Sequence, residues 1–174
     1  MTRKIVTETS SSNPQESPSK KPKSTRAHSI PIYRVTLVQE GKVKSYRKRI
    51  VNSSTASNVL RSYLDDADRE HFVVLLLDRK HQMIGINTVS IGSLTASVVH
   101  PREVWKPAIL SNAAAIICGH NHLSGDPEPS SEDRAITKRL VDSGKMLGIN
   151  VLDHVIVGDE RHFSFADEGL IAEK

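Results

Sequence analysis

The sequence predicts an α/β protein in which helices alternate with buried strands. Two apolar runs, at residues 72–77 and 113–118, have the length of strands, and residues 151–157 are expected to form a last central strand. Such runs are typical of strands that are covered on both faces of a sheet. Helical patterns at residues 53–64 and 131–146 alternate with them, and this order favours a layered α/β fold. The 174 residues are sufficient for one domain with its own core.

The composition is that of a soluble globular protein, with 37% apolar and 25% charged residues. The sequence has one cysteine, Cys118, so an intrachain disulfide is excluded and a reducing compartment fits best. The apolar runs are too short to cross a bilayer, and the N-terminus has no apolar stretch of signal-peptide length. We therefore expect a cytoplasmic protein with no membrane partner.

Residues 1–28 are rich in serine, proline and lysine and almost free of large apolar side chains. Such a segment buries too little surface to offset its ordering entropy, so we predict a disordered basic tail before one domain over residues 29–174. Residues 1–30 carry six basic and two acidic side chains, while the remainder is balanced. The tail either binds nucleic acid or another acidic partner or serves only solubility, and both interpretations stay open.

A strand and its return strand are predicted at the start of the domain. From Ile32 onward, Tyr33, Val35 and Leu37 alternate with polar residues, as in a half-buried strand. A turn around residues 40–42 leads to a return strand at 43–51. Its basic cluster is either a solvated edge that discourages strand pairing or a phosphate-binding surface. The cluster comprises Lys44, Arg47, Lys48 and Arg49.

An amphipathic helix and a hairpin follow. Ser53 or Ser54 is the predicted N-cap of the helix. Residues 72–77 then form a buried strand, and a turn around residues 78–82 leads to a second strand at 83–89. The apolar stripe of the helix has the spacing i, i+3, i+4, i+7, i+8 and comprises Ala56, Val59, Leu60, Tyr63 and Leu64.

The second half of the chain is predicted to contain two helices and two strands. Pro101 can open a helix at its first position, whereas Pro107 is expected to kink or split that helix. Gly148 is expected to end the second helix. The remaining elements are a strand at 113–118, a helix at 131–146 and a last central strand at 151–157.

Two histidines and an aspartate surround the loop that follows the strand at 113–118. His120 and His122 are two residues apart, so on an extended segment they face the same side. They lie at the carboxyl end of a strand, where open α/β sheets place their sites. Asp133 stands in the first turn of the next helix. Two histidines and one carboxylate leave the fourth position of a tetrahedral zinc ion open for water, as in catalytic zinc sites.

Nearby residues offer alternatives to this ligand set. Asp126 is a rival third ligand, although it stands in a Gly-Asp-Pro turn, where aspartate commonly bonds to its own backbone. Cys118 lies two residues before His120, but a lone cysteine in an apolar strand is usually a small buried hydrophobe. The zinc deaminase signature needs two cysteines in its second part, so the one cysteine of this chain excludes it.

The spacing H-x-H-x₇-S-x₂-D, read here as His120, His122, Ser130 and Asp133, matches the JAMM motif of the JAB1/MPN metalloproteases. The chain resembles the RadC-type branch of that family over about residues 32–171. Leu123 stands where the family usually has proline. Longer members carry an N-terminal helix-hairpin-helix module for which this chain has no room, which argues against DNA binding through that module. The matching segments outside the motif are His100–Val104, Asn112–Ala115 and Leu152–Gly158.

The resemblance implies a cytidine-deaminase-like α/β/α sandwich with a mixed sheet, and a zinc ion bound by His120, His122 and Asp133. It also implies a glutamate that acts as general base. Glu70, at the entrance to the first buried strand, is the candidate for this role. Glu103 is the rival, although an acidic residue in the first turn of a helix is favourable without any catalytic role.

The resemblance assigns Ser130 to the oxyanion of the tetrahedral intermediate. The alternative is that Ser130 is an N-cap in a capping box with Asp133, which a metal-binding aspartate is expected to close poorly. His154, in the last central strand, is either a satisfied core residue or a fourth ligand.

The implied function is that of a zinc-dependent hydrolase of the metalloprotease type. It would cleave an amide or isopeptide bond of a protein or peptide substrate with a zinc-activated water. The alternative is a RadC-like, DNA-repair-associated protein that binds or acts on DNA, for which the basic tail would be suited. The balanced charge of the domain argues against DNA, and the complete ligand set argues against a non-catalytic scaffold.

Overall fold

A computed structural model describes residues 30–42, 49–92 and 99–171. The chain divides into two compact units, Met1–Arg34 and Val35–Lys174. All described helices and strands belong to the second unit. The predicted tail, residues 1–28, lies outside the described residues.

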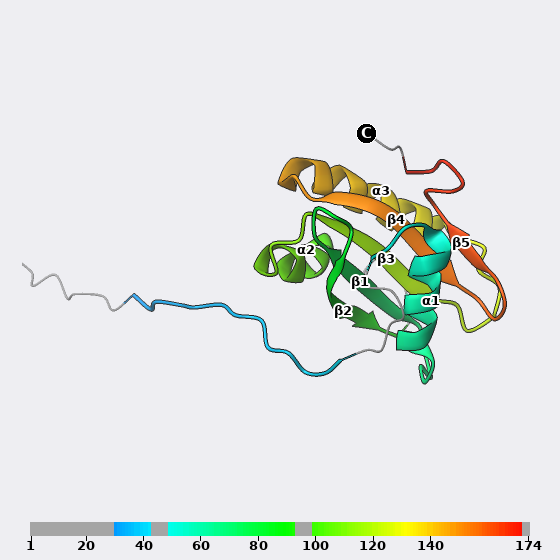
Figure 1. The fold of residues 1–174 in the computed structure, drawn as a ribbon, viewed down its shortest axis with the longest axis horizontal. Helices are drawn as coiled ribbons and strands as arrows, with labels where there is room; N and C mark the ends of the chain where they lie inside the picture. Colours follow the sequence, from blue (N-terminus) through cyan, green and yellow to red (C-terminus); the bar gives the residue numbers. More distant parts are fainter. Residues whose placement is uncertain (1–29, 43–48, 93–98, 172–174) are drawn as a thin grey trace, which may run out of the picture. The chain divides into compact units, whose positions relative to one another are not determined.

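The second unit is built on one five-stranded sheet. Its strands are β1 (His71–Leu77), β2 (Met83–Ile91), β3 (Ala115–Asn121), β4 (Asn150–Val157) and β5 (His162–Ser164). They lie in the order β2-β1-β3-β4-β5, with β3 in the middle (Figure 1). The pair β3–β4 is parallel and the other three pairs are antiparallel. The predicted mixed sheet is therefore confirmed.

Helices cover both faces of the sheet, so the unit has the predicted three α/β/α layers (Figure 1). Helix α1 (Ser53–Leu64) packs on one face, where its apolar stripe meets alternate side chains of β1, β3 and β4. Helices α2 (Pro101–Leu110) and α3 (Ser131–Leu147) pack on the other face. Strands β1 and β3, in the middle of the sheet, are buried on both sides, which explains the apolar runs in their sequences.

Helix α1 packs on β3 through Leu60, whose methyl groups lie 2.5 Å from the position that a Cβ atom on Gly119 would take. The glycine next to His120 leaves room for this side chain. The N-cap of α1 is Asn52, whose Oδ1 accepts from the Thr55 amide at 2.9 Å. The prediction of Ser53 or Ser54 as the cap was therefore wrong by one or two residues.

The hairpin between β1 and β2 confirms the predicted turn at residues 78–82. Oδ1 of Asp78 accepts from the backbone amides of Lys80 and Gln82, each at 2.8 Å. The amide of Asp78 in turn donates to the carbonyl of Gln82. One aspartate thus closes the loop through its own side chain and backbone.

Helix α2 is not split at Pro107. Pro101 occupies the start of the helix as expected, but α2 continues without interruption through Pro107 to Leu110. Proline inside a helix removes one hydrogen bond and costs about 3 kcal/mol. Pro107 and its neighbour Ala108 are both buried against the sheet, and this burial offsets part of that cost.

The first predicted strand is not present. Residues 30–42 contain neither helix nor strand, and their apolar side chains are exposed, with Ile32 99% and Tyr33 82% accessible. An alternating pattern forms a stable strand only when a partner strand and a covered face exist, and no described strand pairs with this segment.

Of the predicted return strand, residues 43–48 lie outside the described residues, and with them Lys44, Arg47 and Lys48. Arg49 forms only an isolated bridge with Gln82. The short strand β5 was not predicted. No helix within the described ranges has both the length and the apolar character needed to span a membrane.

Candidate metal centre

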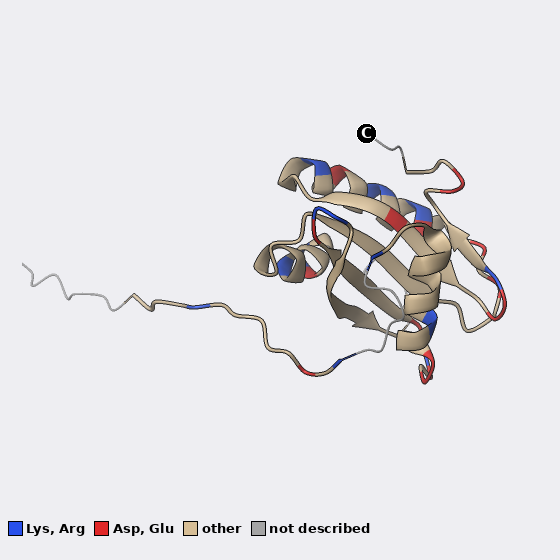
Figure 2. Ribbon diagram, in the orientation of Figure 1, with Lys and Arg blue, Asp and Glu red and all other residues tan. Residues whose placement is uncertain are grey.

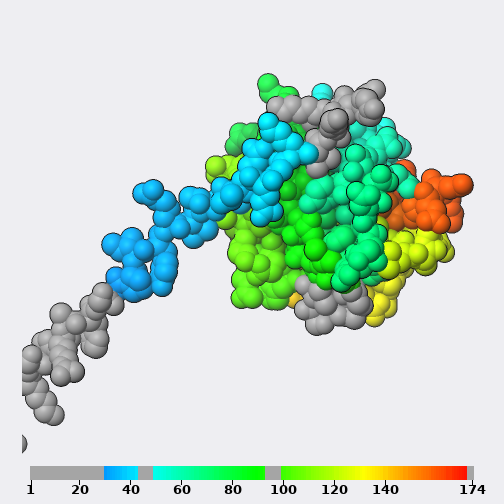
Figure 3. Space-filling view, turned by 90° about the horizontal axis from the view of Figure 1, so that it is seen from below, coloured from blue at the N-terminus to red at the C-terminus, as the bar shows by residue number. Residues whose placement is uncertain are grey.

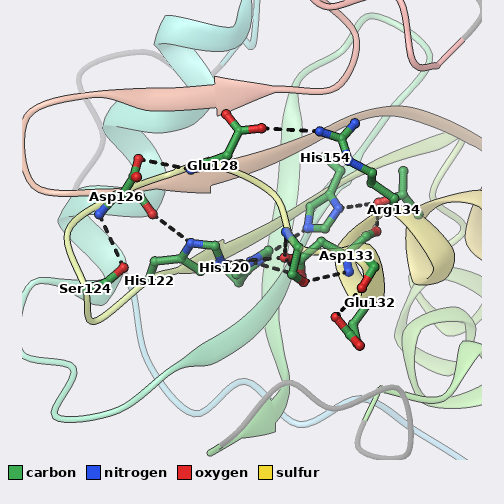
Figure 4. Close-up of polar contacts among 12 residues, drawn as sticks. His120, His122, Ser124, Asp126, Glu128, Glu132, Asp133, Arg134 and His154 are labelled. Atoms are coloured by element: carbon green, nitrogen blue, oxygen red, sulfur yellow. Dashed lines mark hydrogen bonds and ion pairs between the residues drawn. The ribbon is translucent and has the colours of Figure 1, made fainter.

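The two predicted histidines meet at the carboxyl end of β3, the middle strand. Their Nε2 atoms lie 3.0 Å apart (Figure 4). His120 is fully buried, whereas the side chain of His122 is 15% exposed. The Nδ1 atom of His122 faces the backbone carbonyl of Asp126 at 2.8 Å. Because this carbonyl can only accept, the neutral ring carries its proton on Nδ1 and turns the lone pair of Nε2 toward His120.

Asp133 completes the cluster from the first turn of α3. Its Oδ1 lies 3.3 Å from Nε2 of His120, and its Oδ2 lies 3.6 Å from Nε2 of His122. Donor atoms of the three residues all lie within 4.8 Å of one another. Bonds of about 2.0–2.1 Å to a tetrahedral zinc ion would place neighbouring donors about 3.3 Å apart. The donor set and its spacing therefore fit a zinc ion, and the cluster can bind a metal.

The loop between His122 and Ser130 is held by the turn that joins β4 and β5. The amide of Asp159 donates to the carbonyl of Gly125 at 3.0 Å, and a Cβ atom on Gly158 would collide with that same carbonyl. Figure 3 shows this turn (orange) next to the yellow loop segment. The contact is close enough that only glycine fits at residue 158 without a backbone shift.

A residue that sequence reasoning missed anchors this turn. The guanidinium of Arg61, in α1, donates to the carbonyls of Gly158 and Asp159 at 2.6 Å and of Arg161 at 2.7 Å. Three charge-assisted bonds connect α1 to the turn that supports the loop. A basic residue in the last turn of a helix gives no sequence signal for such a contact.

The candidates Asp126 and Cys118 both lie outside the cluster that the described residues form. Asp126 supports His122 through its backbone, and its carboxylate lies 3.5 Å from the guanidinium of Arg161. Cys118 is fully buried in β3. Burial, and then the charge of Asp153, raise the pKa of the Cys118 thiol, so at neutral pH it is a thiol and not a thiolate.

Ser130 and Asp133 form a complete capping box. The Asp133 amide donates to Ser130 Oγ at 3.1 Å, while Oδ2 of Asp133 accepts from the Ser130 amide at 2.9 Å and from its hydroxyl at 2.6 Å. The expectation that a metal-facing aspartate would close the box poorly was wrong. Asp133 has two oxygens, so Oδ2 closes the box while Oδ1 faces His120.

His154, in β4, faces Nδ1 of the His120 ring, whereas the other donors face Nε2 of that ring. Its Nε2 is 2.9 Å from Nδ1 of His120, and its Nδ1 is 2.6 Å from Oγ1 of Thr137. Burial lowers the pKa of His154 to about 4, so the ring is neutral at pH 7. The structure therefore supports the interpretation of a satisfied core residue. The contribution of Thr137 was not anticipated.

The pKa values of the three donors are shifted by their surroundings. Burial, and then the nearby His154, lower the pKa of His120 well below its usual value. Burial alone would raise the pKa of Asp133, but its contacts with His122, His120 and Ser130 hold it below its usual range. The carboxylate of Asp133 raises the pKa of His122. His120 and Asp133 thus have the protonation that metal binding needs.

Glu70 stands one residue before β1. Strands β1 and β3 are antiparallel with Phe72 opposite His120, and the two rings stack at a centroid distance of 6.0 Å. Continued by two residues, this register would bring Glu70 opposite His122. Its charge contributes to the raised pKa of His122, which is consistent with this proximity.

Asn121, between the two histidines, fixes the backbone on either side of Glu70. Its Oδ1 accepts from the His71 amide at 2.8 Å, and its Nδ2 donates to the carbonyl of Arg69 at 3.1 Å. The carbonyl of Glu70 itself accepts from the amide of Gly92 at 2.8 Å. The strand that carries the histidines therefore also sets the position of Glu70.

Glu103 has a different environment on α2. It lies in the first turn and forms ion pairs with Arg102, at 3.3 Å, and with Lys106. Its hydrogen bond with Lys106 lowers its pKa despite some desolvation. These contacts account for Glu103 as a helix-stabilising residue.

The fold and the cluster define an α/β/α domain with a two-histidine, one-aspartate cluster that could bind a metal ion. The chain belongs to the RadC-like JAB domain family, whose model matches residues 50–170. The resemblance predicted from the motif is therefore confirmed at the level of the family.

The similar proteins are UPF0758 proteins of bacteria and archaea. One from Desulforamulus reducens is 55% identical over 108 residues, which are 62% of this chain and 48% of that protein. One from Methanosarcina acetivorans is 45% identical over 129 residues, 74% of this chain and 56% of that protein. One from Alkaliphilus metalliredigens is 50% identical over 123 residues, 71% of this chain and 53% of that protein. The chain thus spans about half the length of the curated relatives it matches.

Proposed function

We propose that the protein is a zinc-dependent hydrolase of the metalloprotease type that cleaves an amide or isopeptide bond in a protein or peptide substrate. The observation that carries the proposal is the donor geometry, since His120, His122 and Asp133 have the identity and spacing of a three-ligand zinc site. The side chain of His122 is partly exposed, so the cluster borders solvent, as access for a substrate requires.

A zinc ion at this cluster would supply an activated water as the nucleophile. Glu70 is the proposed general base, which takes a proton from the nucleophile and returns it to the leaving amine. The strand register that would bring it opposite His122 and the Asn121 bonds on both sides of it support this role. Glu103 is the weaker candidate, because its carboxylate is engaged with Arg102 and Lys106.

Ser130 is the proposed donor to the oxyanion that forms at the cleaved carbonyl. Its hydroxyl lies beside the Asp133 carboxylate, to which it donates at 2.6 Å. The same side chain therefore also orients a ligand and starts α3. The two roles are compatible, because the hydroxyl oxygen stays fixed by the Asp133 amide when its proton turns to another acceptor.

The experiment compares Glu70→Gln with its matched control Glu103→Gln on peptide and isopeptide libraries, with and without zinc. Glu70→Gln retains size but cannot accept a proton, so we expect hydrolysis to fall by roughly 10²–10⁴-fold while zinc content is unchanged. Glu103→Gln should keep its activity. An active Glu70→Gln beside an inactive Glu103→Gln would reassign the base, and two active variants would refute the glutamate mechanism.

The second candidate function is binding to or action on DNA. The observation that favours it is the six basic residues within positions 1–30. In the folded unit, basic and acidic side chains are interspersed along α3 (Figure 2). A DNA arm in the same experiment decides between the two functions. Cleavage of DNA that depends on the cluster, with no peptide hydrolysis, would replace the protease proposal.

A further inference from the structure

We propose that His154 and Thr137 are positioning residues that fix the ring of His120 with its Nε2 lone pair toward the metal. They do so through a series of hydrogen bonds that begins at the ring of His120 and ends at the backbone carbonyl of Asp133. The inference rests on the proposed function only in assuming that the cluster binds a metal ion.

The series of hydrogen bonds connects three elements in the buried interior. Nδ1 of His120, on β3, lies 2.9 Å from Nε2 of His154, on β4. Nδ1 of His154 lies 2.6 Å from Oγ1 of Thr137, on α3, and that oxygen lies 2.6 Å from the backbone carbonyl of Asp133. His120 and His154 are fully buried and Thr137 is 3% exposed, so water does not compete for these bonds.

Only one arrangement of protons satisfies all three contacts. The Asp133 carbonyl can only accept, so the hydroxyl of Thr137 donates to it. The Thr137 oxygen must then accept from Nδ1 of His154. A neutral ring protonated on Nδ1 has its lone pair on Nε2, so His154 accepts the proton of Nδ1 of His120. One backbone carbonyl thereby sets the tautomers of two imidazoles.

The outcome for His120 is a lone pair on Nε2, the atom that faces His122 and Asp133. His122 reaches the same state in one step, because its Nδ1 faces the carbonyl of Asp126. Both ligand histidines are therefore oriented by backbone carbonyls, one directly and the other through His154 and Thr137. This role is typical of residues behind a metal ligand, which orient it and raise its basicity.

Aromatic packing holds the intermediate ring in place. The ring of His154 stacks on Phe165 at a centroid distance of 5.0 Å and an angle of 14°. Phe72 contacts it at 5.3 Å, and Phe72 also stacks on His120. Tilting of the His154 ring out of its plane would disturb both contacts, and the hydrogen bonds at its two nitrogens fix which nitrogen faces which partner.

The series of hydrogen bonds also joins two of the three ligands without any metal. It begins at the His120 ring and returns to the backbone of Asp133, whose carboxylate faces the other side of that ring. Helix α3 is thus fixed relative to β3 at the residue that supplies a ligand. We expect a site of this kind to be assembled before the metal arrives.

The test uses Thr137→Val, which keeps the shape of the side chain and removes the hydroxyl. Thr137→Ser retains the hydroxyl. Thr88→Val is the matched control. Thr88 lies on β2, and its hydroxyl is 2.8 Å from the hydroxyl of Tyr63 on α1, far from the cluster in the sequence. Zinc affinity is measured by competition with a chromophoric chelator, and melting temperatures of the metal-free proteins are recorded alongside.

We expect Thr137→Val to weaken zinc binding by about 10–100-fold, while Thr137→Ser and Thr88→Val bind zinc as the wild type does. Comparable melting temperatures of the two valine variants would show that the loss of affinity is not a loss of fold. Equal zinc affinity of Thr137→Val and the wild type would overturn the inference.

A second readout works without zinc and without activity. Long-range ¹H–¹⁵N NMR spectra of the metal-free protein identify which nitrogen of His120 and of His154 carries the proton. Nδ1 protonation of both rings supports the inference, and a proton on Nε2 of neutral His154 overturns it. If the wild type binds no zinc, the metal proposal fails, and this spectrum still decides the inference.

Discussion

Asn121 offers a direct test of how the strand that carries the histidines positions the proposed base. Its amide makes two hydrogen bonds, to the His71 amide at 2.8 Å and to the Arg69 carbonyl at 3.1 Å. The variant Asn121→Ala removes both. Each such bond contributes about 0.5–1.5 kcal/mol, and the side chain is partly exposed, so we expect a loss of about 1–2 kcal/mol. In a domain of this size that corresponds to a fall in Tm of roughly 2–8 °C.

The effect on chemistry should exceed the effect on stability. Release of the backbone around Glu70 lets its carboxylate move, and a misplacement of about 1 Å can reduce a rate by about 10²-fold. We therefore expect hydrolysis by Asn121→Ala to fall by roughly 10–100-fold. Zinc content should not change, because Asn121 is not one of the donors.

The matched control is Asn52→Ala. It also removes an asparagine amide with two contacts, to the amide and the hydroxyl of Thr55 at 2.9 and 2.7 Å. The loss of this N-cap should cost about 1 kcal/mol and leave hydrolysis unchanged. The assays are thermal unfolding, zinc analysis and hydrolysis of the same library substrate. If Asn121→Ala is as active as Asn52→Ala at similar stability, the proposed positioning of Glu70 is refuted.

Three further predictions concern the fold. Gly158→Ala should be destabilised by about 1–3 kcal/mol, because its Cβ would collide with the Gly125 carbonyl, whereas a Cβ at Gly85 would meet only Leu76 at 3.4 Å. Equal thermal stability of Gly158→Ala and Gly85→Ala would contradict this. Cys118 is buried with a raised pKa, so a thiol reagent at pH 8 should label it only after denaturation, and rapid labelling of the native protein would show that β3 opens. Deletion of residues 1–28 should leave the Tm within about 5 °C of the full chain, and a larger fall would mean that the segment is folded or docked.

The cluster of His120, His122 and Asp133 was predictable because the relation of these residues is local. His120 and His122 share a side through strand periodicity, and Asp133 is placed by the helix start that follows one loop later. The alternation of helices and buried strands was predictable for a similar reason, since these elements carry their own periodic signals, whereas the three layers and the mixed sheet came from the family resemblance. Both the cluster and the order of helices and strands therefore follow from residues that are close together in the sequence.

The residues that support the site could not be predicted in the same way. Thr137 and His154 meet across α3 and β4, and Arg61 reaches a turn about one hundred positions further along the chain. Such contacts depend on how the elements pack, and the sequence of each element does not contain that information. The strand predicted from Tyr33 to Leu37 failed for a related reason, because alternation identifies a face but not a partner.

The central claim is that three residues form a metal site, and zinc stoichiometry tests it most directly. Purified protein dialysed against a small excess of zinc should hold about one zinc ion per chain, and His122→Ala should lose it, because two remaining ligands are too few for a stable site. Zinc should also raise the Tm of the wild type and not that of the variant. A wild-type protein that stays metal-free under these conditions, or a variant that binds zinc equally well, would contradict the account.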